Sequence, residues 1–342
     1  TQMDIRQLRY FITIVEQGSF SAAAAVLNVA QPALSIHLRN MEAALGLPLL
    51  LRGPQGVVPT EAGQVLLQRA RLIVDTLASA QQDILSLGTD PAGEVRLGLP
   101  ATISGIIAVP LITQARKRFP RIKITIAEAM SGFVNEWLMQ GRLDFAVLYS
   151  QIAQRGVQWS AMVREELVMI CPNLPADDLA SSMELSQIGG HRLILPSGSH
   201  GLRAMLSDAP LILPSGAHGL RAMLERAAEA EGVTLAPEIE IDSYHNIIAL
   251  VVSGMGASVL PYHAVAAEAE KGLLRIRHFS KPTLWRQAHL AHLTSRPMTR
   301  AAEAIGALLR EVVVELVQSG VWAGAKLVPP DAQNSSADEL VD

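Results

Sequence analysis

The chain has little cysteine, few aromatic residues and no long apolar run. Cys171 is the one cysteine among 342 residues, so an intramolecular disulfide framework is excluded. No apolar run approaches the length of a membrane span, and the polar start at residues 1–4 lacks the pattern of a signal peptide. These absences argue against a secreted disulfide-rich domain and against a membrane protein, and we expect a cytoplasmic protein without a membrane partner.

The motifs of common enzyme and metal-binding classes are also missing. The nine histidines show no spacing such as His-Glu-x-x-His, and there is no Gly-x-Ser-x-Gly elbow. The glycines at 254 and 256 lack the third glycine and the acidic residue of a dinucleotide site. We therefore expect no metal, no cofactor and no enzymatic activity. A Ser/His hydrolase-like enzyme using the serines and histidine of residues 197–200 with His218, or a solute-binding module, is the alternative.

Two short helical patterns open the chain. The first is apolar on one side, at Leu8, Phe11, Ile12 and Val15. Gly18 ends it, and Ser19 and Ser21 are alternative N-caps for the next helix. The inward face of that second helix is formed by Phe20, Ala23, Ala24 and Leu27.

A third helix is expected to start at Gln31, with Pro32 at the first helical position, where its missing N–H is harmless. Its inward residues are Leu34, Leu38, Met41 and Leu45. The outer faces carry Gln31, Ser35, Ile36, His37 and Arg39. Such a face can enter the major groove of DNA, although three short helices alone are as typical of a small bundle with a solvated polar face.

The next segment favours DNA binding. Residues 49–58 form two short apolar runs around a Gly/Pro turn, which predicts a β-hairpin wing, and residues 59–61 open a new helix. A wing beside a recognition helix is a DNA-binding arrangement.

These residues resemble the N-terminal signature of the LysR-type transcriptional regulators. The matching positions are 24–27, 31–35, 38, 41–42, 46, 49, 52 and 59–63. The resemblance implies DNA contacts at Gln31, Pro32, Ser35, His37, Arg39 and Arg52, with Ser21 and Thr60 on phosphates. Ile36 and His37 stand where the family usually carries polar or basic residues, and Gln55 stands at a commonly basic wing tip. Ile36 can meet a thymine methyl group or pack on the neighbouring helix, and packing is the favoured interpretation.

The head carries little positive charge, and a repeat beside it supplies a means of pairing. Residues 1–60 hold four arginines against three acidic residues, so we expect modest affinity from one copy. Apolar residues then recur at alternating spacings of four and three, at Leu66, Ala70, Ile73, Leu77, Ala80, Ile84 and Leu87. A buried helix in a monomer can produce such a stripe, but a strict 3.5-residue period favours a partner helix and a homodimer.

Beyond a linker at residues 89–93, short β-branched runs alternate with helical patterns. Strands are expected near 95–99, 122–127, 143–148, 239–241, 257–260, 273–277 and 288–293, and helices near 103–119, 133–140, 243–253 and 299–317. Strand–helix–strand order implies a parallel sheet with right-handed crossovers. Two α/β subdomains joined by crossing strands resemble the family's effector domain, which is similar to type 2 periplasmic-binding proteins.

The expected fold is therefore a multidomain α+β protein with four parts. They are a winged helix-turn-helix domain at 1–60, a linker and dimerisation helix with a hinge at 61–92, an α/β effector domain at 93–320 and a polar, disordered tail at 321–342. Subdomain I takes about 93–169 and 270–320, and subdomain II takes about 170–269.

Loops where strands lead into helices are natural sites for an anion, because helix N-termini present free N–H groups. The candidate effector-binding residues are Ala101, Thr102, Ser131, Gly132, Ser197, Gly198, Ser215, Gly216 and His218. Taken singly, each hydroxyl residue is as well explained as a helix cap. Together they lie where the family holds its ligand, so we expect a small anionic effector in the cleft between the subdomains.

An internal repeat falls on two of these loops. Residues 193–206 recur as residues 211–224, with Ser199 replaced by Ala217, which indicates a recent tandem duplication. One sheet position holds one strand, and residues 208–210 cut the first copy's helix short. We expect the second copy to fill the effector-loop position, with the first as an inserted loop or extra helical turn.

The resulting functional hypothesis is a regulator that grips promoter DNA with paired heads. It is expected to be a homodimer through the linker helices, and a homotetramer through the effector domains. Ligand closing the cleft would bias the placement of the heads and so change contact with the transcription machinery.

Overall fold

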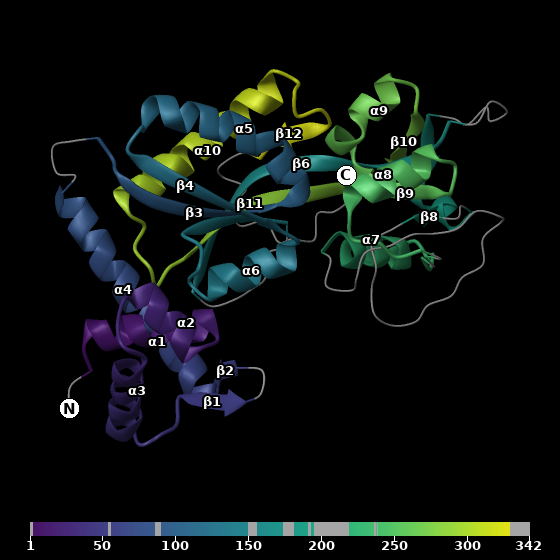
Figure 1. Ribbon diagram of the computed structural model, residues 1–342. Helices are drawn as coiled ribbons and strands as arrows, with labels where there is room; N and C mark the ends of the chain where they lie inside the picture. Colours follow the sequence, from purple (N-terminus) through teal and green to yellow (C-terminus); the bar gives the residue numbers. More distant parts are fainter. Residues whose placement is uncertain are drawn as a thin grey trace.

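The computed structural model describes residues 3–53, 56–85, 90–149, 156–173, 181–190, 193–194, 219–235, 237 and 239–328. Its N-terminal head consists of three helices and a two-stranded wing (Figure 1). These are α1 (Ile5–Gln17), α2 (Phe20–Leu27), α3 (Gln31–Leu45), β1 (Leu50–Gly53) and β2 (Gly56–Pro59). All five lie where the sequence pattern predicts them.

Local signals set the limits of these helices. Asp4 caps α1 in a capping box with Gln7, and Gly18, with φ of 60°, ends the helix in a left-handed conformation. Of the two alternative caps for α2, Ser19 is used, since its side chain accepts a hydrogen bond from the backbone N–H of Ala22 at 3.4 Å. Ser21 is thereby left exposed on the first turn of α2.

The head has its own core, which differs from expectation in α1 and α3. In α1, Ile14 is 1% exposed although the predicted stripe did not include it, and Ile12 and Val15 pack on the core from partly buried positions. Leu34, Leu38 and Met41 are buried as predicted, but Leu45 is 45% exposed. The reason is that α3 ends immediately after Leu45, and the chain turns so that Leu49 fills the core instead.

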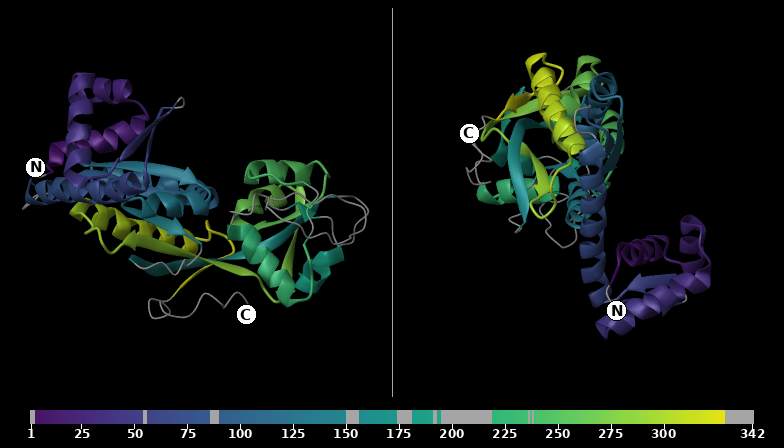
Figure 2. Two further views of the ribbon diagram at one scale, coloured as in Figure 1. Left: turned by 90° about the horizontal axis from the view of Figure 1, so that it is seen from below. Right: turned by 90° about the vertical axis from the view of Figure 1, so that its left-hand side faces the viewer.

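The linker helix α4 (Glu61–Leu85) runs from the head along the effector domain, as the right-hand view of Figure 2 shows. The residues of the predicted dimer seam have two different environments along this helix. Leu66 and Ala70 pack into the core of the head, so they stabilise the monomer. Farther along, four seam residues lie exposed: Ile73, Leu77, Ala80 and Ile84. Leu87 lies outside the described residues.

Subdomain I of the effector domain is a sheet with helices on its faces. Its strands β3 (Gly93–Pro100), β4 (Ile122–Ala129) and β5 (Phe145–Leu148) are parallel, as predicted from the strand–helix–strand order. The helices are α5 (Ala101–Arg118), α6 (Ser131–Met139) and α10 (Arg300–Gln318). Gly98 permits close packing, because a Cβ there would lie 2.6 Å from Val134 of α6.

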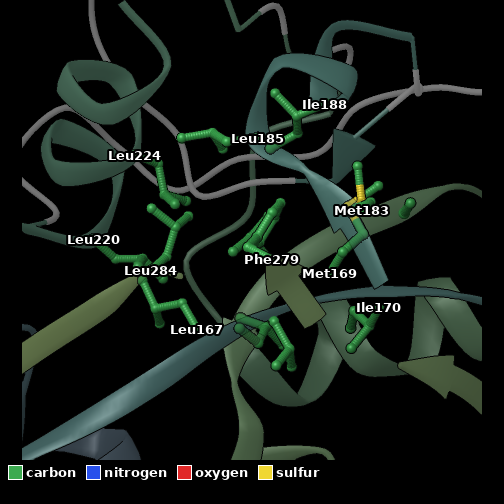
Figure 3. Packing of buried hydrophobic residues seen from close by; sticks show 14 of the residues in the cluster. Leu167, Met169, Ile170, Met183, Leu185, Ile188, Leu220, Leu224, Phe279 and Leu284 are labelled. Carbon is green, nitrogen blue, oxygen red and sulfur yellow. The ribbon is translucent and has the colours of Figure 1, made fainter. Parts of the chain in front are cut away.

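Subdomain II is built around the far half of one long strand. Its elements are β7 (Ser182–Glu184), the 3₁₀ helix η1 (Leu185–Gly190), β8 (Leu193–Ile194), α7 (Gly219–Ala230), α8 (Tyr244–Val252), β9 (Ala257–Pro261), the 3₁₀ helix η2 (Tyr262–Ala264), α9 (Ala266–Glu270) and β10 (Leu274–Lys281). Its hydrophobic core includes Leu167, Phe279 and Leu284, which Figure 3 labels. The strand expected at 239–241 is reduced to two bridged residues.

The two subdomains share their crossing strands. β6 (Val157–Pro172) pairs with β11 (Trp285–Leu293) along its first half and with β9 and β10 along its second. The sheet has ten strands, of which seven follow the order β4-β3-β5-β11-β6-β10-β7, while β8, β9 and β12 (Ala325–Leu327) pair off this path. The boundary expected at residue 169/170 therefore lies within one continuous strand, which connects both cores.

The predicted start of a disordered tail at residue 321 is wrong. Trp322 is 1% exposed, and β12 (Ala325–Leu327) pairs antiparallel with β6. Gly324 has a φ of 71° and packs so closely that a Cβ there would lie 2.7 Å from the Cβ of Tyr262. The polar composition gave no indication that Trp322 is buried and anchors this segment. The effector domain therefore extends at least to residue 327.

Within the described ranges, no single helix combines the length and apolar character needed to cross a membrane. The bent pair α2 and α3 meets that test together, by length and composition alone.

Candidate DNA-binding face and effector cleft

The outer face of α3 is open to solvent. Gln31, Pro32 and Arg39 are exposed, and Ile36 is 53% exposed on the side opposite the buried stripe. The structure therefore contradicts the favoured interpretation that Ile36 packs on a neighbouring helix. Two other expected contact residues, Ser35 and His37, are half-buried.

His37 is turned toward the head rather than fully outward. Its ring meets Tyr10 of α1 edge-on, with 5.1 Å between ring centroids. Its Nδ1 is buried and has no hydrogen-bond partner in the described part of the chain. The side chain thus packs between α1 and α3 and is only partly open to solvent.

The remaining expected contact residues flank α3. The guanidinium of Arg52 lies over the ring of Phe20, 4.3 Å from its centroid, so the wing is tied to α2 by a cation–π contact. The hydroxyl of Thr60 donates to the carbonyl of Pro48 at 2.7 Å and accepts from the N–H of Gly63 at 3.0 Å. Thr60 is therefore the N-cap of α4, and its phosphate contact stays a prediction.

The effector cleft lies where both subdomains meet the crossing strands. The cavity there is lined by Pro100, Ala101, Ala129, Met130, Ser131, Tyr149, Leu220, Asp242, Tyr244 and Arg286. Its volume is about 30 Å³, enough for roughly one water molecule. In this conformation the two subdomains are closed upon each other.

Two helix N-termini converge on the cavity. Ala101 opens α5 and Ser131 opens α6, and neither helix has a side-chain cap. Their first-turn N–H groups and dipoles favour a negative charge at this place. Gly132 follows Ser131 in the same first turn, whereas Thr102 is buried.

A buried cluster of charged and hydroxyl groups forms the floor of the cavity. Arg286 of β11 pairs with Glu165 of β6 through its Nε, and the two residues face each other in the strand register. Another guanidinium nitrogen donates to Thr102 Oγ1 at 2.9 Å and to the hydroxyl of Tyr149 at 2.8 Å. The same guanidinium lies over the Tyr149 ring, 3.7 Å from its centroid.

Subdomain II and the C-terminal segment complete this cluster. His263 Nδ1 lies 3.2 Å from Glu165 Oε2, an ion-pair distance without hydrogen-bond alignment, and its Nε2 contacts the Thr102 carbonyl at 3.2 Å. Trp322 Nε1 donates to Glu165 Oε2 at 3.2 Å. Glu165 thus contacts both subdomains and the segment that follows α10.

The electrostatics keep this pair ionised. Burial by itself would raise the pKa of Glu165, but Arg286 and His263 overcome it and lower that pKa to about 2. Burial works against the charge of Arg286, yet Glu165, Tyr149 and Tyr244 raise its pKa above the usual value. Burial also raises the pKa of Tyr149 well above its usual value, so its phenol stays protonated as a hydrogen-bond donor.

Sequence reasoning missed the cluster. It placed Ala101, Thr102, Ser131 and Gly132 at the cleft, and of these Ala101 and Ser131 line the cavity. Arg286, Glu165 and Tyr149 were not singled out, although an acidic residue inside an apolar strand is a recognisable signal of a buried ion pair. Ser197, Gly198, Ser215, Gly216 and His218 lie outside the described residues.

The repeat contributes both copies to the fold. The strand β8, Leu193–Ile194, comes from the first copy and pairs in parallel with β9. The helix α7, which starts at Gly219, comes from the second copy. The first copy therefore supplies the strand and the second copy the helix, while the loop position that the second copy was expected to fill lies outside the described residues.

A winged head on a linker helix, followed by two subdomains that meet at a small polar cavity, is the arrangement of a DNA-binding transcriptional regulator with an effector-binding domain. Residues 5–64 match the model of the bacterial regulatory helix-turn-helix protein, lysR family. Residues 88–209 and 203–314 match the LysR substrate binding domain. The chain belongs to the LysR family.

Known proteins agree with this assignment over most of the chain. The nitrogen assimilation regulatory protein nac of Klebsiella aerogenes is 30% identical over 320 residues, covering 92% of this chain and 95% of the relative. The protein of that name in Escherichia coli is 34% identical over 77% of this chain and 79% of its own. Full-length OxyR from Pseudomonas aeruginosa shares the fold, with a TM-score of 0.69, 21% identity, and coverage of 92% of this chain and 95% of that one.

The match to the effector domain also bears on the repeat. Its two pieces overlap at residues 203–209, at the end of the first copy. Such an overlap is what an extra copy inserted into a single domain produces, and it supports the duplication.

Proposed function

We propose that the regulator responds to a small anion bound in the cleft between the subdomains. The observation that carries this proposal is the convergence of two uncapped helix N-termini, those of α5 and α6, on a cavity that also contains Arg286. Oriented N–H groups and a guanidinium are the donors that carboxylates and phosphates need.

The charges around the cavity narrow the class of ligand. Arg286 is already paired with Glu165, and Asp242 lines the side of the cavity formed by subdomain II. A purely anionic ligand would meet this carboxylate unfavourably. The proposal therefore favours a ligand whose anionic group faces α5 and α6 and whose hydroxyl or amino group faces Asp242.

Ligand entry requires the subdomains to separate, since the closed cavity holds about 30 Å³. The crossing strands β6 and β11 are the continuous connections on which such a movement would turn. Ligand would shift the population between open and closed arrangements only if it prefers one of them.

One route from the cleft to the linker helix runs through β3. This strand ends at Pro100, which lines the cavity, and carries Arg96 at its middle. Arg96 bonds to Asp75 of α4 at 3.1 Å, and Arg296 bonds to the same carboxylate at 3.0 Å. Asp144 holds both arginines, at 3.5 and 2.7 Å, so α4 is attached to subdomain I by a network of four charges.

A second route runs through α6. Ser131 at its start lines the cavity, and the carbonyl of Gln140 at its end accepts a hydrogen bond from Arg71 of α4 at 3.4 Å. Arg71 also pairs with Glu16 of α1 at 2.9 Å. A change in the position of α6 would therefore alter the contacts of Arg71, which connects α6 with both the linker helix and the head.

The active form we propose is at least a homodimer through α4, with a homotetramer through the effector domains. Four exposed seam residues on α4 and the weak positive charge of one head support pairing. CbnR, solved as a complex with its target DNA, shares the fold at a TM-score of 0.51 and 18% identity. Paired heads would bring promoter DNA to the transcription machinery in a ligand-dependent geometry.

The ligand is tested by a thermal-shift and calorimetry screen of small carboxylates and phosphates against their neutral amides and alcohols. We expect anions to raise the melting temperature of the full chain. Ser131→Asp should abolish that shift, because an acid in the first turn suits the helix but repels an anionic ligand. Thr299→Asp, at the N-cap of α10 outside the cavity lining, is the matched control and should keep the shift. Binding only of compounds that carry no carboxylate or phosphate group would refute the anionic ligand.

A further inference from the structure

The most exposed large apolar side chain on α3 is Ile36, at 53% exposure. Successive residues of a helix are separated by about 100°, so Ile36 points away from both Leu34 and Leu38. Those two leucines are 0% and 4% exposed and fix the inward side of α3. Ile36 therefore lies at the centre of the outward face.

Ile36 has no packing role within the described head. It is absent from the partly buried residues that surround the head core, none of which comes from α3. Its helical neighbours on the outward face are Pro32, one turn before it, and Arg39 and Asn40, one turn after it, all exposed. A large apolar group thus lies in the middle of the solvent-exposed face of α3.

The chemistry of the major groove supplies a partner for such a group. Only thymine presents a methyl group there, whereas the other base edges present hydrogen-bond donors and acceptors. An isoleucine side chain cannot hydrogen-bond to any of those groups, and would leave them without water if it were pressed against them.

We propose that Ile36 selects thymine at one position of each half-site, by packing against the C5 methyl group in the major groove. This inference rests on the entry of α3 into that groove, which the sequence pattern predicts. Burying one methyl-sized group contributes a preference of about fourfold for thymine over a base that lacks the methyl. Arg39 and Gln31 would hydrogen-bond to neighbouring base edges or phosphates.

The test uses duplexes selected from a random-sequence library by the full-length protein. Each thymine of the selected site is replaced singly by deoxyuridine, which removes the methyl group and leaves the hydrogen-bonding groups unchanged. For the unmodified protein we expect one position per half-site where this replacement weakens binding about fourfold. Ile36→Ala should bind the thymine duplex as weakly as the uracil duplex, and so lose the preference.

Val26→Ala is the matched control, because Val26 is 58% exposed on the adjacent helix α2. This variant should keep the full preference for thymine. If no position responds to deoxyuridine, or if Ile36→Ala responds as the unmodified protein does, the inference is wrong. If Ile36→Ala weakens dimer formation and binds all duplexes equally less well, Ile36 serves packing between copies and the inference is also wrong. Failure of the unmodified protein to select any duplex would refute DNA binding itself.

Discussion

The candidate DNA-binding face and the candidate effector cleft use charged residues in opposite ways. On α3 and the wing, Arg39 and Arg52 are exposed, and a single head carries little net charge. In the cleft, Arg286 and Glu165 are 3% and 1% exposed and pair with each other. The exposed arginines on the head can therefore contact a partner. The buried pair in the cleft instead contributes its charges to contacts within the protein.

This difference has an energetic consequence. An exposed charge keeps its water, so removing it changes stability little. A buried charge has lost its water, and removing its partner leaves it uncompensated. Substitutions on the head should therefore affect binding without affecting folding, while substitutions at the cleft floor should affect both.

The largest effect is expected from breaking the buried pair. Glu165→Ala leaves Arg286 buried without its carboxylate and removes the acceptor of Trp322, so we expect about 3–5 kcal/mol lower stability. Urea denaturation followed by tryptophan fluorescence measures it. The double variant Glu165→Leu with Arg286→Met should recover most of the loss, because two apolar residues leave no unpaired charge. A single variant as stable as the unmodified protein would remove the contrast between the two regions.

A buried neutral histidine sharpens the same contrast. His289 of β11 is 4% exposed and meets the Trp159 ring edge-on, and burial lowers its pKa to about 4. In the unfolded chain a histidine titrates near 6.5. Between these pH values the unfolded state binds more protons, so stability must fall as the pH falls through this window.

We expect this group to contribute roughly 1–2 kcal/mol of lost stability between pH 7 and pH 5. Denaturation at a series of pH values measures the slope. His289→Asn should flatten it, while His245→Asn, at an exposed position on α8, should leave it unchanged. An equal slope in all three proteins would show that His289 does not titrate as its burial implies.

The head could be predicted almost completely from the sequence. Its helices follow a 3.6-residue apolar period, and Gly18, Ser19 and the wing turn mark their limits. The exceptions are Ile14, which is buried outside the predicted stripe, Ile36, which is exposed instead of packed, and Leu45, whose exposure depends on where the chain turns after Gly46. Such a turn is a tertiary property that the helical period does not contain.

The cleft was predictable only in part, because its parts are distant in the sequence. The starts of α5 and α6 follow from strand–helix order. The pairing of Glu165 with Arg286 depends on the register between β6 and β11, which one sequence does not specify. Trp322 was missed for a similar reason, since a polar segment gave no sign that one of its residues is buried.

On the head, removal of one exposed cation should weaken DNA binding alone. Arg39→Ala should lower affinity for a selected duplex about tenfold and, if it contacts a phosphate, reduce the salt slope by about 1. The unfolding free energy should change by less than about 0.5 kcal/mol. Arg116→Ala, exposed on α5 of the effector domain, is the matched control and should change neither. Gel shifts over a salt series measure both quantities, and an unfolded Arg39→Ala head would contradict the contrast.

The smallest effect is expected from removing one copy of the repeat. Deleting residues 197–214 joins the first copy's strand, Leu193–Ile194, to the second copy's helix at Gly219 with the spacing of a single copy. The retained strand and helix are those that the fold uses, and the shorter connection reduces the entropy lost on closing it. Because that entropy varies only with the logarithm of length, stability should rise by about 1 kcal/mol or less. Thermal unfolding and DNA binding of the shortened protein measure the outcome. If the shortened protein does not fold, the deleted residues make contacts that the remaining copy cannot make, and the expectation is wrong.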